Sequence, residues 1–322
     1  MQAYAKWKSL MLETFSHHAM LAAPLFVLVL VGYMLMRFGH WPSEVADALT
    51  RFVFNVAMPA LLFHLMSNFS TLPPVDARLL IAFFGGCIIV FIIGRLVAWK
   101  MFGLDGVSQS VFALGGIFSN NVLLGIPLAK LLLGDDSLPS AALVIAFNAL
   151  TLWTMVTISV EWARHGELSV KGFGNTAKNV LTNPLVAAIV LGTLFGLTGL
   201  PLPRLVDEPL VLIGSATMPM ALVALGMGLA EYGIKQGWQQ SVAITILKLV
   251  VQPLVVWLIA YLIGLPRMET RTVVLLASIS TGINVYLMSR QFKAVEGPVA
   301  SALVLSTIVA AITVPLLITL TE

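Results

Sequence analysis

Long apolar stretches alternate with short polar ones along most of the chain. Each apolar stretch has the length, about 20 residues, that a helix needs to cross the hydrocarbon core of a bilayer. The polar breaks carry turn residues and charge, as in WPSE at 41–44 and GDDSLP at 134–139. The pattern predicts an all-α integral membrane protein with ten transmembrane helices. The predicted spans are 19–37, 45–67, 78–102, 107–133, 138–163, 176–198, 208–230, 239–264, 270–293 and 296–320.

The composition supports the same class. Hydrophobic residues make up 59% of the 322 positions and charged residues 10%, against roughly 25% charged residues in soluble domains. Mean hydropathy is +0.97. The net charge of +3 comes from Lys and Arg in short loops, where they set topology. We therefore expect the lipid bilayer as a partner and no nucleic acid.

The spans hold no set of residues for catalysis or metal binding. Cys87 is the single cysteine, so neither a disulfide framework nor a cysteine metal site is available. Spans four and nine carry no His, Asp or Glu near mid-depth. The sequence predicts that the protein is not an enzyme and that it has no metal and no cofactor.

The two halves of the chain repeat each other at a spacing of 160 positions. Prolines and a Met-Pro pair return at this spacing, which is harder to attribute to chance than matching leucines. An odd number of spans per repeat predicts an inverted topology, typical of secondary transporters. We expect a first repeat at 1–163, with an interfacial segment at 1–18, a central loop at 164–178 and a second repeat at 179–322. The pairs are Pro24 and Pro184, Gly32 and Gly192, Met58-Pro59 and Met218-Pro219, and Ala142 and Ala302.

Loop charges predict the orientation. Ten Lys and Arg lie in the loops on one side and seven on the other. By the positive-inside rule, both termini are expected on the non-cytoplasmic side.

Spans four and nine are the least helical and occupy corresponding places in the two halves. Irregular backbone at membrane depth is tolerated where it is buried or lines a cavity. Two broken helices would direct their N-terminal amides at one locus, which suits a carboxylate. The alternative is that these small polar residues only cross-link helices. The candidate substrate-binding residues are Ser119, Asn120, Asn121, Ser280, Thr281, Gly282 and Asn284, and the candidate helix-break residues are Gly125, Pro127, Pro59 and Pro219.

The positions of the carboxylates and of one lysine indicate which kinds of substrate the site could accept. All fifteen Asp and Glu lie in tails, loops or near span ends, which disfavours a cation substrate or carboxylate-based proton coupling. Lys248 lies well inside span eight, four residues before Gln252. Lys248 and Gln252 either support a path for the anion, or Lys248 is a lysine whose side chain snorkels to the membrane interface.

Several segments resemble the auxin efflux carrier family, which includes bacterial malonate transporters. They are NNVLLGIPL at 120–128, RFVFNVAMPALLF at 51–63 and LKLVVQPL at 247–254. The resemblance covers nearly the whole chain. It implies broken, crossed helices four and nine, an elevator-like movement, and a role for Asn120 at the substrate carboxylate. Where plant carriers place Pro at the crossing, this chain has Ser119 and Ser280.

The leading hypothesis is a secondary carrier of a small organic anion, a mono- or dicarboxylate such as malonate, in a bacterial inner membrane. A sodium-coupled organic-anion symporter of the bile-acid type and a channel or receptor are the alternatives. The coupling ion, Na⁺ or H⁺, stays open at this point, as does the oligomeric state, a homodimer included.

Overall fold

Helices joined by short turns and two short extended segments make up the residues described by this computed structural model, 2–68, 75–165, 184–232 and 237–320. Seven helical segments there are long and apolar enough to cross a membrane, and two shorter apolar helices cover Asn121–Leu133 and Pro184–Gly196. The predicted class, an all-α integral membrane protein, is confirmed at this level. The expected central loop at 164–178 lies outside the described residues from position 166 onward.

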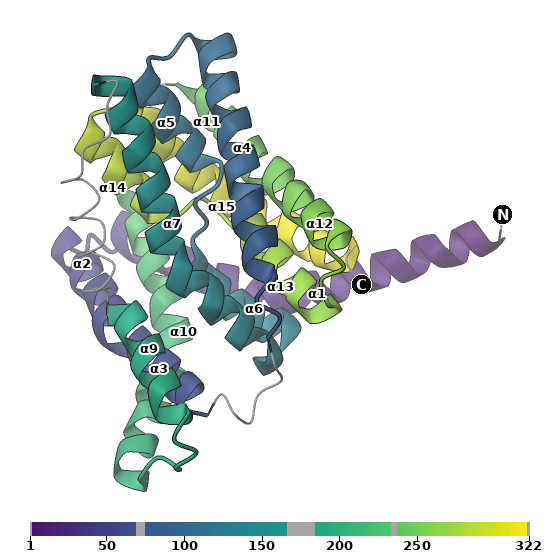
Figure 1. The fold of residues 1–322 in the computed structure, drawn as a ribbon, viewed down its shortest axis with the longest axis vertical. Helices are drawn as coiled ribbons and strands as arrows, with labels where there is room; N and C mark the ends of the chain where they lie inside the picture. Colours follow the sequence, from purple (N-terminus) through teal and green to yellow (C-terminus); the bar gives the residue numbers. More distant parts are fainter. Residues whose placement is uncertain (1, 69–74, 166–183, 233–236, 321–322) are drawn as a thin grey trace.

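The first half begins with a helix that extends beyond its predicted span. The α1 helix projects from the body at its N-terminal end (Figure 1) and runs without interruption through the segment expected to be separate and interfacial. The elements of this half are α1 (Gln2–Arg37), α2 (Ser43–Phe52), η1 (Val53–Ala57), α3 (Met58–Ser67), α4 (Leu79–Phe102), α5 (Gly106–Gly115), η3 (Asn121–Gly125), α6 (Ile126–Leu133), η4 (Asp135–Ser137) and α7 (Leu138–His165).

The second half begins with a short helix and ends with one that matches its predicted span, 296–320. In Figure 1, α3, α9 and α10 occupy the lower part of the view, and α4, α5 and α11 the upper part. The elements are α9 (Pro184–Gly196), α10 (Arg204–Tyr232), α11 (Trp238–Ile246), η5 (Leu247–Val251), α12 (Gln252–Leu262), α13 (Arg267–Ser278), α14 (Ile283–Phe292) and α15 (Glu296–Leu320).

Three spans contain a π-helical turn directly before a proline. In η1, η3 and η5 the π turn is followed by an α-helix whose second residue is Pro59, Pro127 or Pro253. Proline has no N–H to close the preceding turn, and a π turn is one way for the chain to absorb the lost hydrogen bond. Pro219, expected to break span seven, instead lies inside an uninterrupted α10. Neighbouring helices and side chains make such a proline tolerable in a membrane helix.

Two pairs of helices approach each other closely through glycine. A methyl group on Gly32 in α1 would lie 2.1 Å from the carbonyl oxygen of Val223 in α10. A methyl group on Gly192 in α9 would lie 2.7 Å from the carbonyl oxygen of Phe63 in α3. Small residues allow this backbone contact, which is a main source of helix association in membranes.

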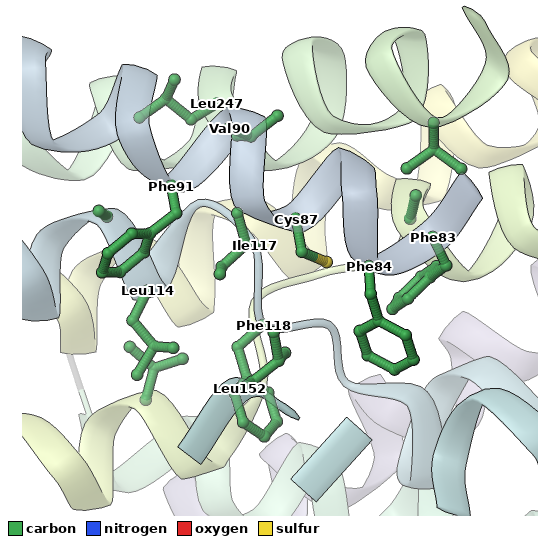
Figure 2. Packing of buried hydrophobic residues seen from close by; sticks show 14 of the residues in the cluster. Phe83, Phe84, Cys87, Val90, Phe91, Leu114, Ile117, Phe118, Leu152 and Leu247 are labelled. Atoms are coloured by element: carbon green, nitrogen blue, oxygen red, sulfur yellow. The ribbon is translucent and has the colours of Figure 1, made fainter. Parts of the chain in front are cut away.

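The largest buried cluster joins α4, α5 and α7 to the second-half helices from α11 to α15. Phe83, Phe84 and Phe91 of α4 pack towards Leu114, Ile117, Phe118 and Leu152 (Figure 2). The outer face of α4 is also apolar, with Ile81, Ile88 and Ile92 exposed. Apolar side chains on both faces fit a helix buried on one side and facing lipid on the other.

Candidate functional site

Two interrupted helices meet in the interior. The α5 helix ends at Gly115, and helical structure resumes at Asn121 in η3. The α13 helix ends at Ser278, and α14 begins at Ile283 after extended backbone at Ile279 and Gly282. The glycine pair Gly115-Gly116 weakens the first helix where it ends, because glycine is a poor helix former. The first break therefore lies before Gly125 and Pro127, which are part of the helix that follows it.

The two breaks pair with each other. Ser119 and Thr281 form an isolated antiparallel bridge. The amide of Asn120 donates to the carbonyl of Ser280 at 2.9 Å, and the amide of Gly282 donates to the carbonyl of Phe118 at 2.7 Å. Backbone groups that leave a helix at membrane depth need partners, and each break supplies them to the other.

Gly282 is required by the closeness of this contact. A methyl group at this position would lie 3.0 Å from Cδ1 of Phe118 and 3.1 Å from the carbonyl oxygen of Ser119. A side chain here would require the ring of Phe118 or the carbonyl of Ser119 to shift by a few tenths of an ångström. Glycine therefore allows the two strands of backbone to hydrogen-bond.

A small cavity of about 70 Å³ lies against the bridge. One side is polar and comes from the two breaks and from α7. The other is apolar and comes from η1, α7 and α9. Its polar wall holds Ser119, Asn120, Asn121, Asn148 and Asn284, and its apolar wall includes Phe54, Ile145, Leu185 and Val186.

Several polar atoms around the cavity are buried without a hydrogen-bond partner. They are Nδ2 of Asn120, Nδ2 and Oδ1 of Asn121, Oδ1 of Asn148, and the hydroxyls of Ser119 and Ser280. Buried polar atoms are nearly always paired, and leaving one unpaired costs about 1–3 kcal/mol. A group of them in one place is the arrangement expected where a polar ligand completes the bonding.

Two helix N-termini also lie at the cavity. The helical run Asn121–Leu133 begins after Asn120, and α14 begins after Gly282. Neither Asn120 nor Gly282 caps its helix with a side-chain hydrogen bond. The first amides of a helix have no partner within it and carry partial positive charge. The cavity therefore offers neutral donors and dipole ends, a combination that suits an anion.

Three other predicted residues, Thr281, Gln252 and Lys248, do not line the cavity and instead bond to the backbone beside it. Thr281 turns away from it, because its hydroxyl donates to the carbonyl of Gly115 at 3.0 Å. Gln252 donates from Nε2 to the carbonyl of Ile117 at 2.9 Å. Lys248 is fully buried and donates to Oε1 of Gln252 at 2.6 Å and to the carbonyl of Ala277. Its ammonium is held inside the protein, so the snorkelling interpretation is wrong.

Asn148 was missed by the sequence reasoning. It lies in α7 at 7% exposure, and it lines the cavity together with the residues of the breaks. The signal in the sequence is a single amide inside the apolar run ALVIAFNAL at 142–150. The sequence does not show which face of span five points towards the crossing, so this amide could not be assigned to the site.

Comparison with known proteins identifies the family to which the chain belongs. The membrane transport protein family matches residues 17–318. A protein of Rhizobium meliloti named "Putative malonate transporter" is 25% identical over 301 residues, covering 91% of this chain and 92% of that protein. An uncharacterized transporter of Methanocaldococcus jannaschii is 24% identical, with 87% and 91% covered. Another, from Escherichia coli K12, is 24% identical, with 91% and 94% covered. The chain is therefore a multi-pass integral membrane protein that belongs to the membrane transport protein family, the auxin efflux carrier family that its segments resemble.

Proposed function

We propose that this protein is a secondary carrier that moves a small organic anion, a mono- or dicarboxylate such as malonate. The observation that carries the proposal is the cavity at the crossing, where unpaired amides and hydroxyls meet two helix N-termini. A carboxylate accepts several hydrogen bonds at once and gains from positive dipole ends. The name of the Rhizobium relative agrees with a carboxylate substrate.

We further propose ten spans in two inverted repeats of five, with α5 to α6 as span four and α13 to α14 as span nine. Reciprocal contacts support this. Gly32 meets Val223 as Gly192 meets Phe63, and 160 positions separate Gly32 from Gly192 and Phe63 from Val223. Thr217 donates to the carbonyl of Ala57, its own counterpart at the same spacing, at 2.9 Å. Such contacts between equivalent positions are expected near a two-fold axis relating the repeats.

Alternating access in this proposal is an elevator movement. The apolar wall of the cavity comes largely from η1 and α9, whereas the polar wall comes from the breaks and α7. A sliding surface between these walls would expose the polar wall to each side of the membrane in turn. We place the protein in a bacterial inner membrane with both termini on the non-cytoplasmic side, and we include a homodimer as its assembly.

Counterflow in proteoliposomes tests the transport proposal. Vesicles loaded with unlabelled malonate are diluted into labelled malonate, and a panel of mono- and dicarboxylates is added as competitors, with and without a sodium gradient. We expect saturable exchange that Asn120→Ala and Asn284→Ala reduce about tenfold or more, because each removes a hydrogen bond to a charged group. Thr193→Val is the matched control, because Thr193 lies in α9 and bonds only within its own helix.

The same assay distinguishes the alternatives. Exchange that requires sodium on the trans side would identify the sodium-coupled symporter. A flux that does not saturate and shows no counterflow would identify a channel. Unchanged exchange in both asparagine variants would refute the crossing as the binding site.

A further inference from the structure

Lys248 is the one fully buried lysine within the described residues, and it lies at the crossing. It belongs to η5, the π turn of its span, and its side chain is 0% exposed. A charge buried at membrane depth is costly, and such residues usually face a functional interior. The position therefore requires an explanation beyond packing.

The contacts of the ammonium are all neutral. Lys248 donates to Oε1 of Gln252 and to the carbonyl of Ala277. Gln252 in turn donates to the carbonyl of Ile117 and lies 3.4 Å from the sulfur of Cys87. Among the described residues, no Asp or Glu lies within ion-pairing distance of Lys248. A positive charge on Nζ would therefore have no fixed carboxylate to balance it.

Other titratable groups on the neighbouring elements are remote. The elements packed against η5 are α4, α11, α12, α13 and α15. Cys87 of α4 lies near Lys248, because both contact the side chain of Gln252. Five of the rest lie in the first or last turns of their helices: Lys100, Tyr261, Arg267, Glu269 and Glu296. Arg271 lies in the second turn of α13, and Arg95 lies further inside α4, where it donates to the hydroxyl of Ser159.

Each broken helix consists of a helix before the break and a helix after it. Lys248 lies at the C-terminal ends of the helices before the breaks, and the cavity lies at the N-terminal ends of the helices after them. The carbonyls of Ala277 and Ile117 belong to the C-terminal ends of α13 and α5, which carry negative partial charge. The cavity lies at the N-terminal ends of the helices that follow. An anion in the cavity therefore adds the missing negative charge on the far side of the buried crossing, where electrostatic attraction is stronger than in water.

We propose that Lys248 takes up a proton when a carboxylate binds in the cavity, so that the carrier moves the anion and a proton together. This inference rests on the proposed carrier function. The proton from the aqueous side ends on Nζ, and both ions leave on the opposite side. One carboxylate and one ammonium cancel, so a monocarboxylate moves without net charge and malonate moves with one negative charge. The anion favours the protonated lysine, so by reciprocity its affinity rises as pH falls.

Two hydroxyls lie on the breaks between the carbonyls that hold the lysine and Gln252 and the helix N-termini at the cavity. Ser119 lies between Ile117 and Asn120 on one break, and Ser280 lies between Ala277 and Gly282 on the other. Both hydroxyls are buried without a hydrogen-bond partner. A hydroxyl can donate and accept at once, so these residues can pass a proton from the cavity to the neutral amine Nζ of Lys248, which becomes an ammonium.

The first test is proton uptake by the wild-type protein. Purified carrier in weakly buffered detergent solution with a pH indicator receives malonate adjusted to the same pH. We expect uptake of close to one proton for each malonate bound, between pH 7 and 8. Binding without proton uptake would overturn the proposal. Because this measurement needs no variant, it decides even if changes at Lys248 prevent folding.

The second test is transport driven by a pH gradient at zero membrane potential. With the outside more acidic by one unit, we expect wild-type vesicles to concentrate labelled malonate about tenfold. Lys248→Arg keeps a permanent charge and is expected to exchange malonate with no response to the gradient. Lys248→Met is expected to bind malonate weakly at every pH. Lys130→Met is the control, because Lys130 is half-exposed and pairs with Asp135 at 3.2 Å.

The outcomes distinguish a failure of proton coupling from a failure of the proposed carrier function. Wild-type counterflow that ignores the pH gradient would overturn proton coupling and leave the carrier function intact. A gradient response retained in Lys248→Arg would place the proton on another group. Loss of all carboxylate exchange in the wild type would overturn the proposed function and this inference with it. Malonate's own ionisation is the same in every variant, so a pH effect present only in the wild type belongs to Lys248.

Discussion

The glycine contacts of α1 with α10 and the crossing of the two broken helices solve the same problem in different ways. Both bring backbone close to backbone inside a membrane. At Gly32 the hydrogen bonds stay within uninterrupted helices, and the missing side chain alone permits the approach. At Ser119 and Thr281 the backbone leaves the helix and bonds across the gap. The first contact leaves no polar group unused, whereas the second leaves donors facing a cavity.

The difference shows where function can reside in such a protein. A helix that satisfies its own backbone can pack tightly but offers a ligand nothing polar. A broken helix exposes amides and needs side chains to satisfy its freed carbonyls, as Thr281 and Gln252 do here. We expect changes at the glycine contacts to damage folding and changes at the crossing to damage transport.

The largest effect is expected at the glycine contacts. Gly32→Leu and Gly192→Leu each force a side chain against backbone 2.1 or 2.7 Å away, and overpacking of this kind costs about 3 kcal/mol or more. Thermal unfolding and size-exclusion chromatography in detergent should show lost or aggregated protein. Gly85→Leu is the control, because the nearest atom to its added methyl is a side-chain carbon at 3.7 Å. Equal behaviour of Gly85→Leu and Gly32→Leu would contradict the tight contact.

The next effect is expected at the unpaired amides of the cavity. Asn120→Ala and Asn121→Ala each remove an unpaired Nδ2 donor to the anion, which corresponds to about 1.5–3 kcal/mol, or roughly ten- to hundredfold in malonate affinity. The melting temperature should stay close to the wild-type value, because the protein itself does not pair these atoms. Malonate binding by calorimetry measures the first quantity. A large fall in stability with unchanged binding would make these residues structural.

A smaller effect on both properties is expected at Gly282. A methyl group meets the ring of Phe118 at 3.0 Å, and ring displacement costs about 1 kcal/mol. Gly282→Ala should therefore lower the melting temperature slightly and slow counterflow a few-fold by shifting the bridge. Gly282→Ala combined with Phe118→Leu should recover part of both, since the smaller side chain makes room. If the double variant is no better than the single one, the contact is not the cause.

The smallest effect is expected at the start of α4, far from either contact. Arg78 donates hydrogen bonds to Asp76 at 2.6 and 2.9 Å, and they lower the pKa of this carboxyl from its ordinary value of 3.8. The pair therefore contributes stability above pH 3.8, which is lost as pH falls through the lowered value. Because the pair is exposed, Asp76→Asn should change neither exchange nor unfolding measurably near neutral pH. A clear loss of transport would show that this turn participates in the movement.

Much of the fold follows from the sequence because it depends on length and hydropathy. The last helix matches its predicted span, and α4 begins one residue later than expected. The π turn before Pro59 is a local consequence of a missing N–H, and Asn55 lies within it. Pro219 also follows a methionine, Met218, yet α10 continues through it as an α-helix. The Met-Pro pair alone therefore does not decide whether a π turn forms.

The site was predicted in part. The two breaks were placed in the right spans, since glycine and small polar residues inside an apolar run weaken a helix. The direction of each side chain was not predictable. Thr281 was expected at the substrate and bonds to Gly115, while Asn148 was overlooked and lines the cavity. Direction depends on the rotation of a helix about its axis, which packing sets.

The sequence by itself determined the membrane class, the positions of most helices and the neutral, amide-rich character of the crossing, because these depend on which residues follow one another. The tertiary structure decided which groups meet. It placed Ser119 against Thr281, brought Asn148 from another span to the cavity, and buried Lys248 between two helix ends. Those contacts join residues as far as 162 positions apart (281 − 119), so the close packing of helices, and not any local preference, creates them.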